Sequence, residues 1–106
     1  MAATTPPPAG PRVVIHFRAG SPADEAQAGR LVAALGREAG SAEIRAVPDA
    51  PRTATIRYFR TEDREAAETV ARTLQRASGM SWTIRNSTAF RPSPPPGTIE
   101  AWIPGR

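Results

Sequence analysis

Short segments with alternating hydrophobic and polar residues are separated along the chain by longer segments with helical periodicity. Alternation is typical of a strand with one buried face, and apolar residues three or four positions apart are typical of an amphipathic helix. The first such segment, RVVIHFR at 12–18, is rich in β-branched and aromatic residues and predicts a strand. A helix is predicted from a Ser21 cap, with Pro22 at its first position, to about Ala39, and Gly40 would end it.

The rest of the chain repeats this alternation of strands and helix. The sequence PDAP indicates a turn between two strands, and Thr61 precedes a second amphipathic helix that Gly79 would end. A segment containing RPSPPPG then separates the last two strand-like segments. The predicted elements are strands at 43–47, 53–59, 81–86 and 98–103 and a second helix at 62–77.

The element order, β-α-β-β-α-β with an extra C-terminal strand, predicts an α+β fold of the ferredoxin-like type. Such a split βαβ domain has a single sheet with two helices on one face, because right-handed crossovers place both helices on the same side. The predicted organisation is a Pro-rich linker at 1–11, a βαββαβ domain at 12–86, and a Pro-rich loop with the C-terminal strand at 87–106.

Strand alternation assigns each strand residue to one of two sheet faces. The helix-facing positions would be Val13, Ile15, Phe17, Ala54, Ile56, Tyr58, Trp82 and Ile84. The opposite face is left open by the helices and carries the predicted binding residues His16, Arg18, Arg45, Arg57, Phe59 and Arg85. The alternative is ordinary amphipathic alternation in a chain whose 14 basic residues are all arginine.

The charge of the chain indicates what this open face would bind. The net charge is +4, and arginine pairs with carboxylates and phosphates through its planar fork of donors. The predicted partner is therefore an anionic polymer or an acidic protein surface. Nucleic-acid binding through the same arginines is an alternative. The adjacent Tyr58 and Phe59 point to opposite faces, so they do not form the paired stacking platform of RNA-recognition sheets.

No catalytic, metal or cofactor site is predicted. The chain has no cysteine, which excludes disulfides, thiol catalysis and cysteine-ligated metals. His16 is the only histidine, and no carboxylates have a convincing ligand spacing. Glu62 and Asp63 are neighbours at a helix start, where they compensate the helix dipole and do not face each other. No apolar run reaches the length of a membrane span.

The predicted C-terminal strand has two possible roles. It could pair with an edge of its own sheet, which we favour, or it could pair with a partner strand and so mediate oligomerisation. In the second case Ile99, Trp102 and Ile103 would form the contact. The chain would then be a protein-protein module.

A family resemblance rests on the segments VVIHFRAGSPADEAQAGRLVAALGREAG and TIRYFRTEDREAAETVARTL. This layout resembles the C-terminal domain of LytR-type cell-envelope proteins and, more loosely, the sporulation-related repeat (SPOR) domains that bind peptidoglycan. The Asn-Gly loop usual after the first strand is FRAGS here, and the segment after Ile84 lies outside the pattern. The resemblance implies a non-catalytic accessory domain located at the cell envelope or in the periplasm, where the anionic polymer would be a cell-wall glycan. The matching positions are Arg57, Tyr58, Asp63, Ala66 and Ala67.

Overall fold

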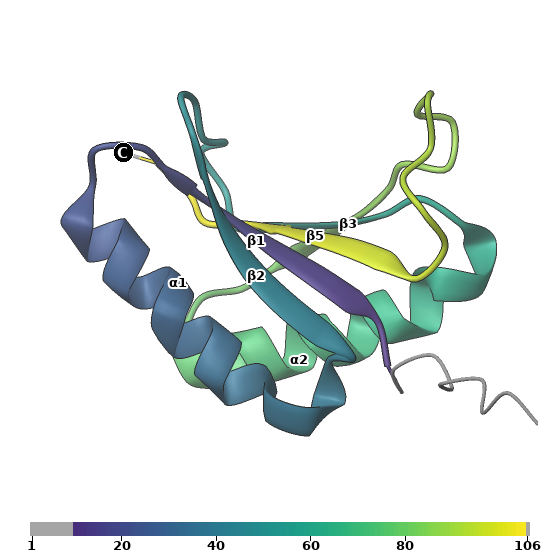
Figure 1. Ribbon diagram of the computed structural model, residues 1–106, viewed down its shortest axis with the longest axis horizontal. Coiled ribbons are helices and arrows are strands. Elements are labelled where there is room, and N and C mark those ends of the chain that lie inside the picture. The colour runs from purple at the N-terminus through teal and green to yellow at the C-terminus, as the bar shows by residue number, and fades with distance from the viewer. Residues whose placement is uncertain (1–9, 106) are drawn as a thin grey trace, which may run out of the picture.

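The computed structural model describes residues 10–105, which form one five-stranded sheet with both helices on one face (Figure 1). The predicted α+β element order, ferredoxin-like βαββαβ plus a C-terminal strand, is confirmed. The predicted linker lies mostly in residues 1–9, outside the described residues. The elements are β1 (Arg12–Arg18), α1 (Pro22–Leu35), β2 (Ser41–Val47), β3 (Thr55–Tyr58), α2 (Arg64–Ser78), β4 (Thr83–Asn86) and β5 (Thr98–Trp102).

The strand order is β2-β1-β5-β3-β4. Each helix connects two neighbouring parallel strands, β1 with β2 and β3 with β4. In a split βαβ unit another strand would separate each such pair, whereas here the two units stay unsplit and β5 joins them. β5 is parallel to β1 and antiparallel to β3. The two units thus run in opposite directions, and crossovers of the same hand bring both helices to one face.

The position of β5 corrects the prediction of a partner-binding C-terminal strand. β5 is hydrogen-bonded on both sides within its own chain, so Ile99, Trp102 and Ile103 cannot pair with a partner strand. Ile99 and Ile103 are completely buried in the core. The favoured intramolecular pairing is correct, and residues 98–103 complete the same sheet as residues 12–86. The free sheet edges belong to β2 and β4.

The core lies between the sheet and the two helices. Ala28, Leu31 and Leu35 of α1 and Val70 and Leu74 of α2 pack against the apolar side of the strands. The predicted helix-facing positions are buried there, except Ile84, which is 38% exposed because β4 is a short edge strand. The buried predicted positions are Val13, Ile15, Phe17, Ala54, Ile56, Tyr58 and Trp82.

The helix ends differ from prediction at two of four positions. Ser21 caps α1 as predicted, with the Asp24 N–H donating to its hydroxyl at 3.3 Å. However, α1 ends at Leu35, where Gly36 adopts a positive φ of 49° and a short 3-10 turn follows. A second 3-10 turn, Thr61–Asp63, precedes α2, so Thr61 is not its cap.

Asp63 has a role that helix-dipole compensation does not describe. Its Oδ2 accepts the backbone N–H of Gly97 at 2.9 Å, which fixes the chain as it enters β5. Arg60 also reaches this region and donates from Nη2 to the carbonyl of Pro94 at 3.3 Å. The Pro-rich loop before β5 is therefore tied to the start of the second helical unit.

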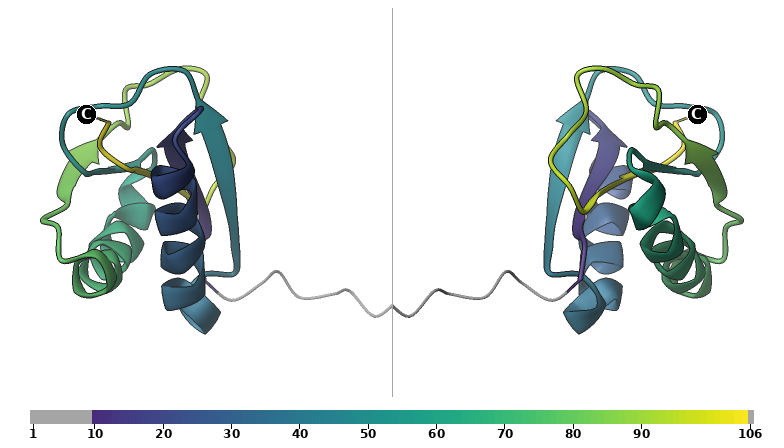
Figure 2. Two further views of the ribbon diagram at one scale, coloured as in Figure 1. Left: turned by 90° about the vertical axis from the view of Figure 1, so that its left-hand side faces the viewer. Right: turned by 90° about the vertical axis from the view of Figure 1, so that its right-hand side faces the viewer.

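Two loops rise from the sheet on the side opposite the helices (Figures 1 and 2). One connects β2 to β3 at residues 48–54, and the other connects β4 to β5 at residues 87–97. The sheet face away from the helices therefore lies between two loops. Neither helix within residues 10–105 has the length and apolar character that crossing a membrane requires.

Candidate binding surface

The sheet face opposite the helices, hereafter the open face, carries most of the charged strand residues. Cross-strand register places Arg57 of β3 opposite Glu100 of β5 and Arg85 of β4. His16 of β1 lies opposite Arg45 of β2 and Trp102 of β5. These residues alternate along their strands with apolar residues on the helix side, so the predicted division of the sheet into two faces holds for these strands. The charged members of the open face are Arg12, Arg18, Glu43, Arg45, Arg57, Arg85 and Glu100.

A stack of three side chains occupies the middle of the open face. The rings of His16 and Trp102 lie parallel, with centroids 4.0 Å apart and an interplanar angle of 6°. The guanidinium carbon of Arg57 lies 5.0 Å from the centroid of the Trp102 ring, a cation–π distance. Because β5 lies between β1 and β3, His16 and Arg57 approach the indole from opposite sides. The indole N–H donates to Glu100 Oε1 at 3.1 Å, which fixes the ring orientation.

His16 is a structural member of this stack and not an accessible binding residue. Its side chain is only 4% exposed, and its Nδ1 is buried without a hydrogen-bond partner among the described residues. Burial lowers the pKa of His16, while the nearby Glu100 carboxylate opposes this shift and the cations of Arg45 and Arg57 add to it. The imidazole that stacks on the indole is therefore neutral at neutral pH.

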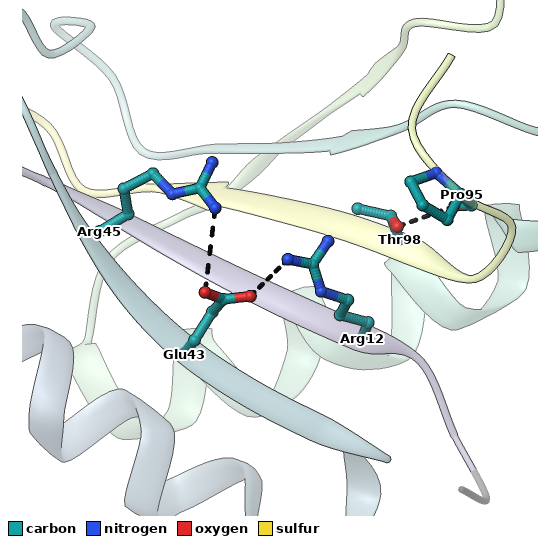
Figure 3. Close-up of polar contacts among 5 residues, drawn as sticks. All are labelled: Arg12, Glu43, Arg45, Pro95 and Thr98. Carbon is teal, nitrogen blue, oxygen red and sulfur yellow. Dashed lines mark hydrogen bonds and ion pairs between the residues drawn. The ribbon is translucent and has the colours of Figure 1, made fainter. Parts of the chain in front are cut away.

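An ion-pair cluster covers the β2 side of the open face (Figure 3). Arg12 Nη2 donates to Glu43 Oε1 at 2.5 Å, and Arg45 Nη2 lies 3.9 Å from Glu43 Oε2. All three side chains are roughly half exposed, so solvent screens these ion pairs. Glu43 neutralises part of the positive charge here but leaves one net cation.

The β3–β4 side of the open face has two arginines and no carboxylate on its own two strands. Arg57 and Arg85 are direct cross-strand neighbours, and Arg85 is exposed. Like charges placed opposite each other are unfavourable unless an anion compensates them. Glu100 lies opposite Arg57 on the other side, where its Oε1 accepts the Trp102 indole N–H. This pair of guanidiniums is thus suited to an external anionic group.

The other two predicted binding residues lie away from the centre. Phe59 follows β3 and is 5% exposed, because Phe90 of the Pro-rich loop packs edge-on against it with centroids 5.8 Å apart. Its assignment to the accessible surface is therefore wrong. Arg18 is half-buried at the end of β1, where it borders a cavity that Asp24 and Pro104 also line.

Four charged or aromatic residues of the open face were not among the predicted binding residues: Arg12, Glu43, Glu100 and Trp102. The signal was present in the sequence, because Thr98, Glu100 and Trp102 alternate with the buried Ile99, Ala101 and Ile103. Applying strand alternation to the last strand would have placed Trp102 on the open face. Arg12 is four residues from His16 in β1, and Glu43 is two residues from Arg45 in β2, so alternation places both on the open face as well.

The arrangement favours an extended anionic ligand over a small one. Arg45, Arg57 and Arg85 lie on three different strands, with two strands between the first and second. At the usual inter-strand spacing, Arg45 is separated across the strands from Arg57 by about 14 Å and from Arg85 by about 19 Å, with a further offset of two residues along the strands. Within the described range no group of three or more His, Cys, Asp or Glu side chains is arranged to hold a metal ion.

One solved structure relates this fold to a known protein. The solution structure of the C-terminal domain of RV0431 matches with a TM-score of 0.50 and 25% sequence identity, over 99% of this chain and 81% of that one. This similarity supports a LytR C-terminal-like relationship. No protein-family model matches the chain, and no curated protein matches it in sequence. The looser resemblance to SPOR repeats stays a prediction.

Proposed function

We propose that this chain is a non-catalytic accessory domain of an envelope-associated protein that binds an anionic polymer, such as a cell-wall glycan, through its open face. The observation that carries the proposal is the set of four arginines, Arg12, Arg45, Arg57 and Arg85, against two glutamates on the face that no helix of the described residues covers. The similarity to the C-terminal domain of RV0431 over nearly the whole chain supports an accessory role.

Arg57 and Arg85 are the central residues of the proposed site. The indole of Trp102 supports the Arg57 guanidinium, which reduces the conformational freedom lost when an anion binds. Arg85 stands beside it on the edge strand and is exposed. Together they offer two guanidinium forks to one carboxylate- or phosphate-bearing segment of a polymer.

Base stacking is less well supported as the mode of binding. Both sides of the Trp102 ring are already occupied, by His16 and by Arg57, and Phe59 is buried. Proteins that bind single-stranded nucleic acids gain much of their affinity from bases that stack on exposed aromatic side chains of the protein. A polyanion recognised through its charge therefore fits this surface better than a stacked base.

Co-sedimentation with isolated bacterial cell wall tests the proposal. The variant R57E/R85E should lose most of its retention, and wild-type retention should fall as salt is raised because the contacts are ionic. The matched control is R30E/R37E, which makes the same change in charge on exposed residues of the helix side. Equal retention of R57E/R85E and wild type would refute the open-face site. Tighter binding to an oligonucleotide than to cell wall would indicate a nucleic acid as the ligand in place of a cell-wall polymer.

A further inference from the structure

The free edge of β2 is the longest unpaired strand edge in the described part of the chain. β2 has seven residues and pairs only with β1, whereas the opposite edge strand, β4, has four. Every β2 residue is exposed or half-exposed. Natural proteins protect such an edge or use it for pairing with another chain.

The hydrogen bonds to β1 determine which backbone groups point outward. The Val47 carbonyl accepts the Ala19 N–H at 2.8 Å, and the Ser41 N–H donates to the Pro11 carbonyl at 3.4 Å. In a parallel pair, alternate residues of a strand direct both their N–H and C=O to the same neighbour. Residues 41, 43, 45 and 47 therefore face β1, and Ala42, Ile44 and Ala46 direct their N–H and C=O to the open edge.

The sequence of β2 is complementary to itself in the antiparallel direction. Around Ile44, the residues are Glu43 on one side and Arg45 on the other, and beyond these an alanine stands at each side. A second β2 strand that runs antiparallel with Ile44 opposite Ile44 would place each Glu43 opposite the other chain's Arg45. Opposite charges in such cross-strand pairs are stabilising.

We propose that two copies of this chain form a symmetric homodimer by antiparallel pairing of their β2 strands, centred on Ile44. This register pairs the outward N–H and C=O groups of Ala42, Ile44 and Ala46 with those of the second copy. Glu43 and Arg45 then occupy non-hydrogen-bonded pairs, in which the side chains of the two strands approach most closely. The proposal is independent of the ligand of the open face.

The side chains on both faces of β2 suit this pairing. Ile44 is on the helix side and remains 40% exposed in the single chain. In the dimer it contacts Ile44 of the second copy at the two-fold axis. On the open face, Glu43 Oε1 can keep its 2.5 Å contact with Arg12. Among the described residues, its Oε2 has only the 3.9 Å contact with Arg45 of its own chain, so it can accept from the second copy's Arg45.

The other free edge lacks these properties. β4 reads TIRN and contains no carboxylate, so it offers no charge pairing with its own copy. Charged residues on an edge often prevent association. On β2, however, Glu43 and Arg45 flank Ile44, so an antiparallel second copy places opposite charges against each other. A partner strand with the reverse charge order would place like charges opposite each other and would be repelled.

Sedimentation velocity on the full chain tests the dimer, at concentrations from about 10 μM to about 1 mM, a range suited to a weak association. The single variants E43R and R45E each place like charges in both cross-strand pairs. Each should raise the dimer dissociation constant by roughly ten- to a hundred-fold, because two attractive pairs become repulsive. The control R85E, on the other edge, should leave the dissociation constant unchanged.

Charge complementation gives the decisive result. Mixing E43R with R45E should restore association as a one-to-one heterodimer, and the double variant E43R/R45E should form a homodimer again. Far-UV circular dichroism of each variant checks that the fold is retained. A wild-type chain that stays monomeric over the whole range would overturn the proposal, as would single variants that associate as well as wild type or a mixture that does not recover.

Discussion

The central position of β5 leads to a quantitative prediction for Ile99→Ala. Ile99 is completely buried between the sheet and the helices, in a strand that is hydrogen-bonded on both sides. Removing three carbon atoms from such a site costs the transfer free energy and leaves a cavity, together about 2–5 kcal/mol. A small domain has a total unfolding free energy of about 5–15 kcal/mol, so this variant should lose a large part of its stability.

Ile84→Ala is the matched control, because it makes the same chemical change at a helix-side position of an edge strand. Ile84 is 38% exposed, so its truncation should cost about 1 kcal/mol. Urea denaturation followed by circular dichroism gives both values, and Ile99→Ala should also lower the melting temperature by about 4–8 °C for each kcal/mol lost. Equal destabilisation by the two substitutions would refute the placement of β5 at the centre of the sheet.

Three further predictions concern polar side chains that are buried or partly buried. Because burial lowers the pKa of His16, the neutral imidazole contributes stability that is complete above pH 6.5 and is lost as the pH falls toward the pKa of the folded state. His16→Gln should therefore flatten this part of the pH profile of the unfolding free energy, measured by urea titration. Asp63→Ala should cost about 1–2 kcal/mol in thermal unfolding by leaving the Gly97 N–H without its acceptor, and Asp63→Asn should cost less because an amide oxygen can still accept. Thr73→Val should cost about 1 kcal/mol in the same assay, because the Thr73 hydroxyl lies 2.6 and 2.7 Å from the two oxygens of Glu38.

Local signals in the sequence were sufficient for the elements and for most of the core. Ser21 followed by proline determined the start of α1, and strand alternation separated Ile56 from Arg57. These signals depend on residues within one or two turns or strand repeats, so they can be recognised without knowledge of the tertiary structure. Strand order is different, because it depends on which distant strands pack together, and no local pattern indicated that β5 lies between β1 and β3.

The same distinction explains the errors in the predicted site. Alternation correctly placed His16 on the open face, but Trp102 stacks on it from a distant part of the chain and buries it. Phe59 is likewise buried by Phe90, which belongs to the Pro-rich loop. Accessibility on a sheet face depends on neighbouring strands, so it could be predicted only after the strand order was known. Arg45 and Arg85 remain exposed because both are on edge strands.

The proposed dimer and the proposed ligand site are geometrically compatible. A two-fold axis through Ile44 and perpendicular to the sheet places both open faces on the same side of one continuous sheet. Arg57 and Arg85 of each copy then face the same direction, at opposite ends of that sheet. A long polymer that contacts both copies would bind the second one at the high effective concentration set by the first. A weak site on each copy can therefore give firm attachment to a polymer, whereas short fragments of the same polymer would bind each copy independently and weakly.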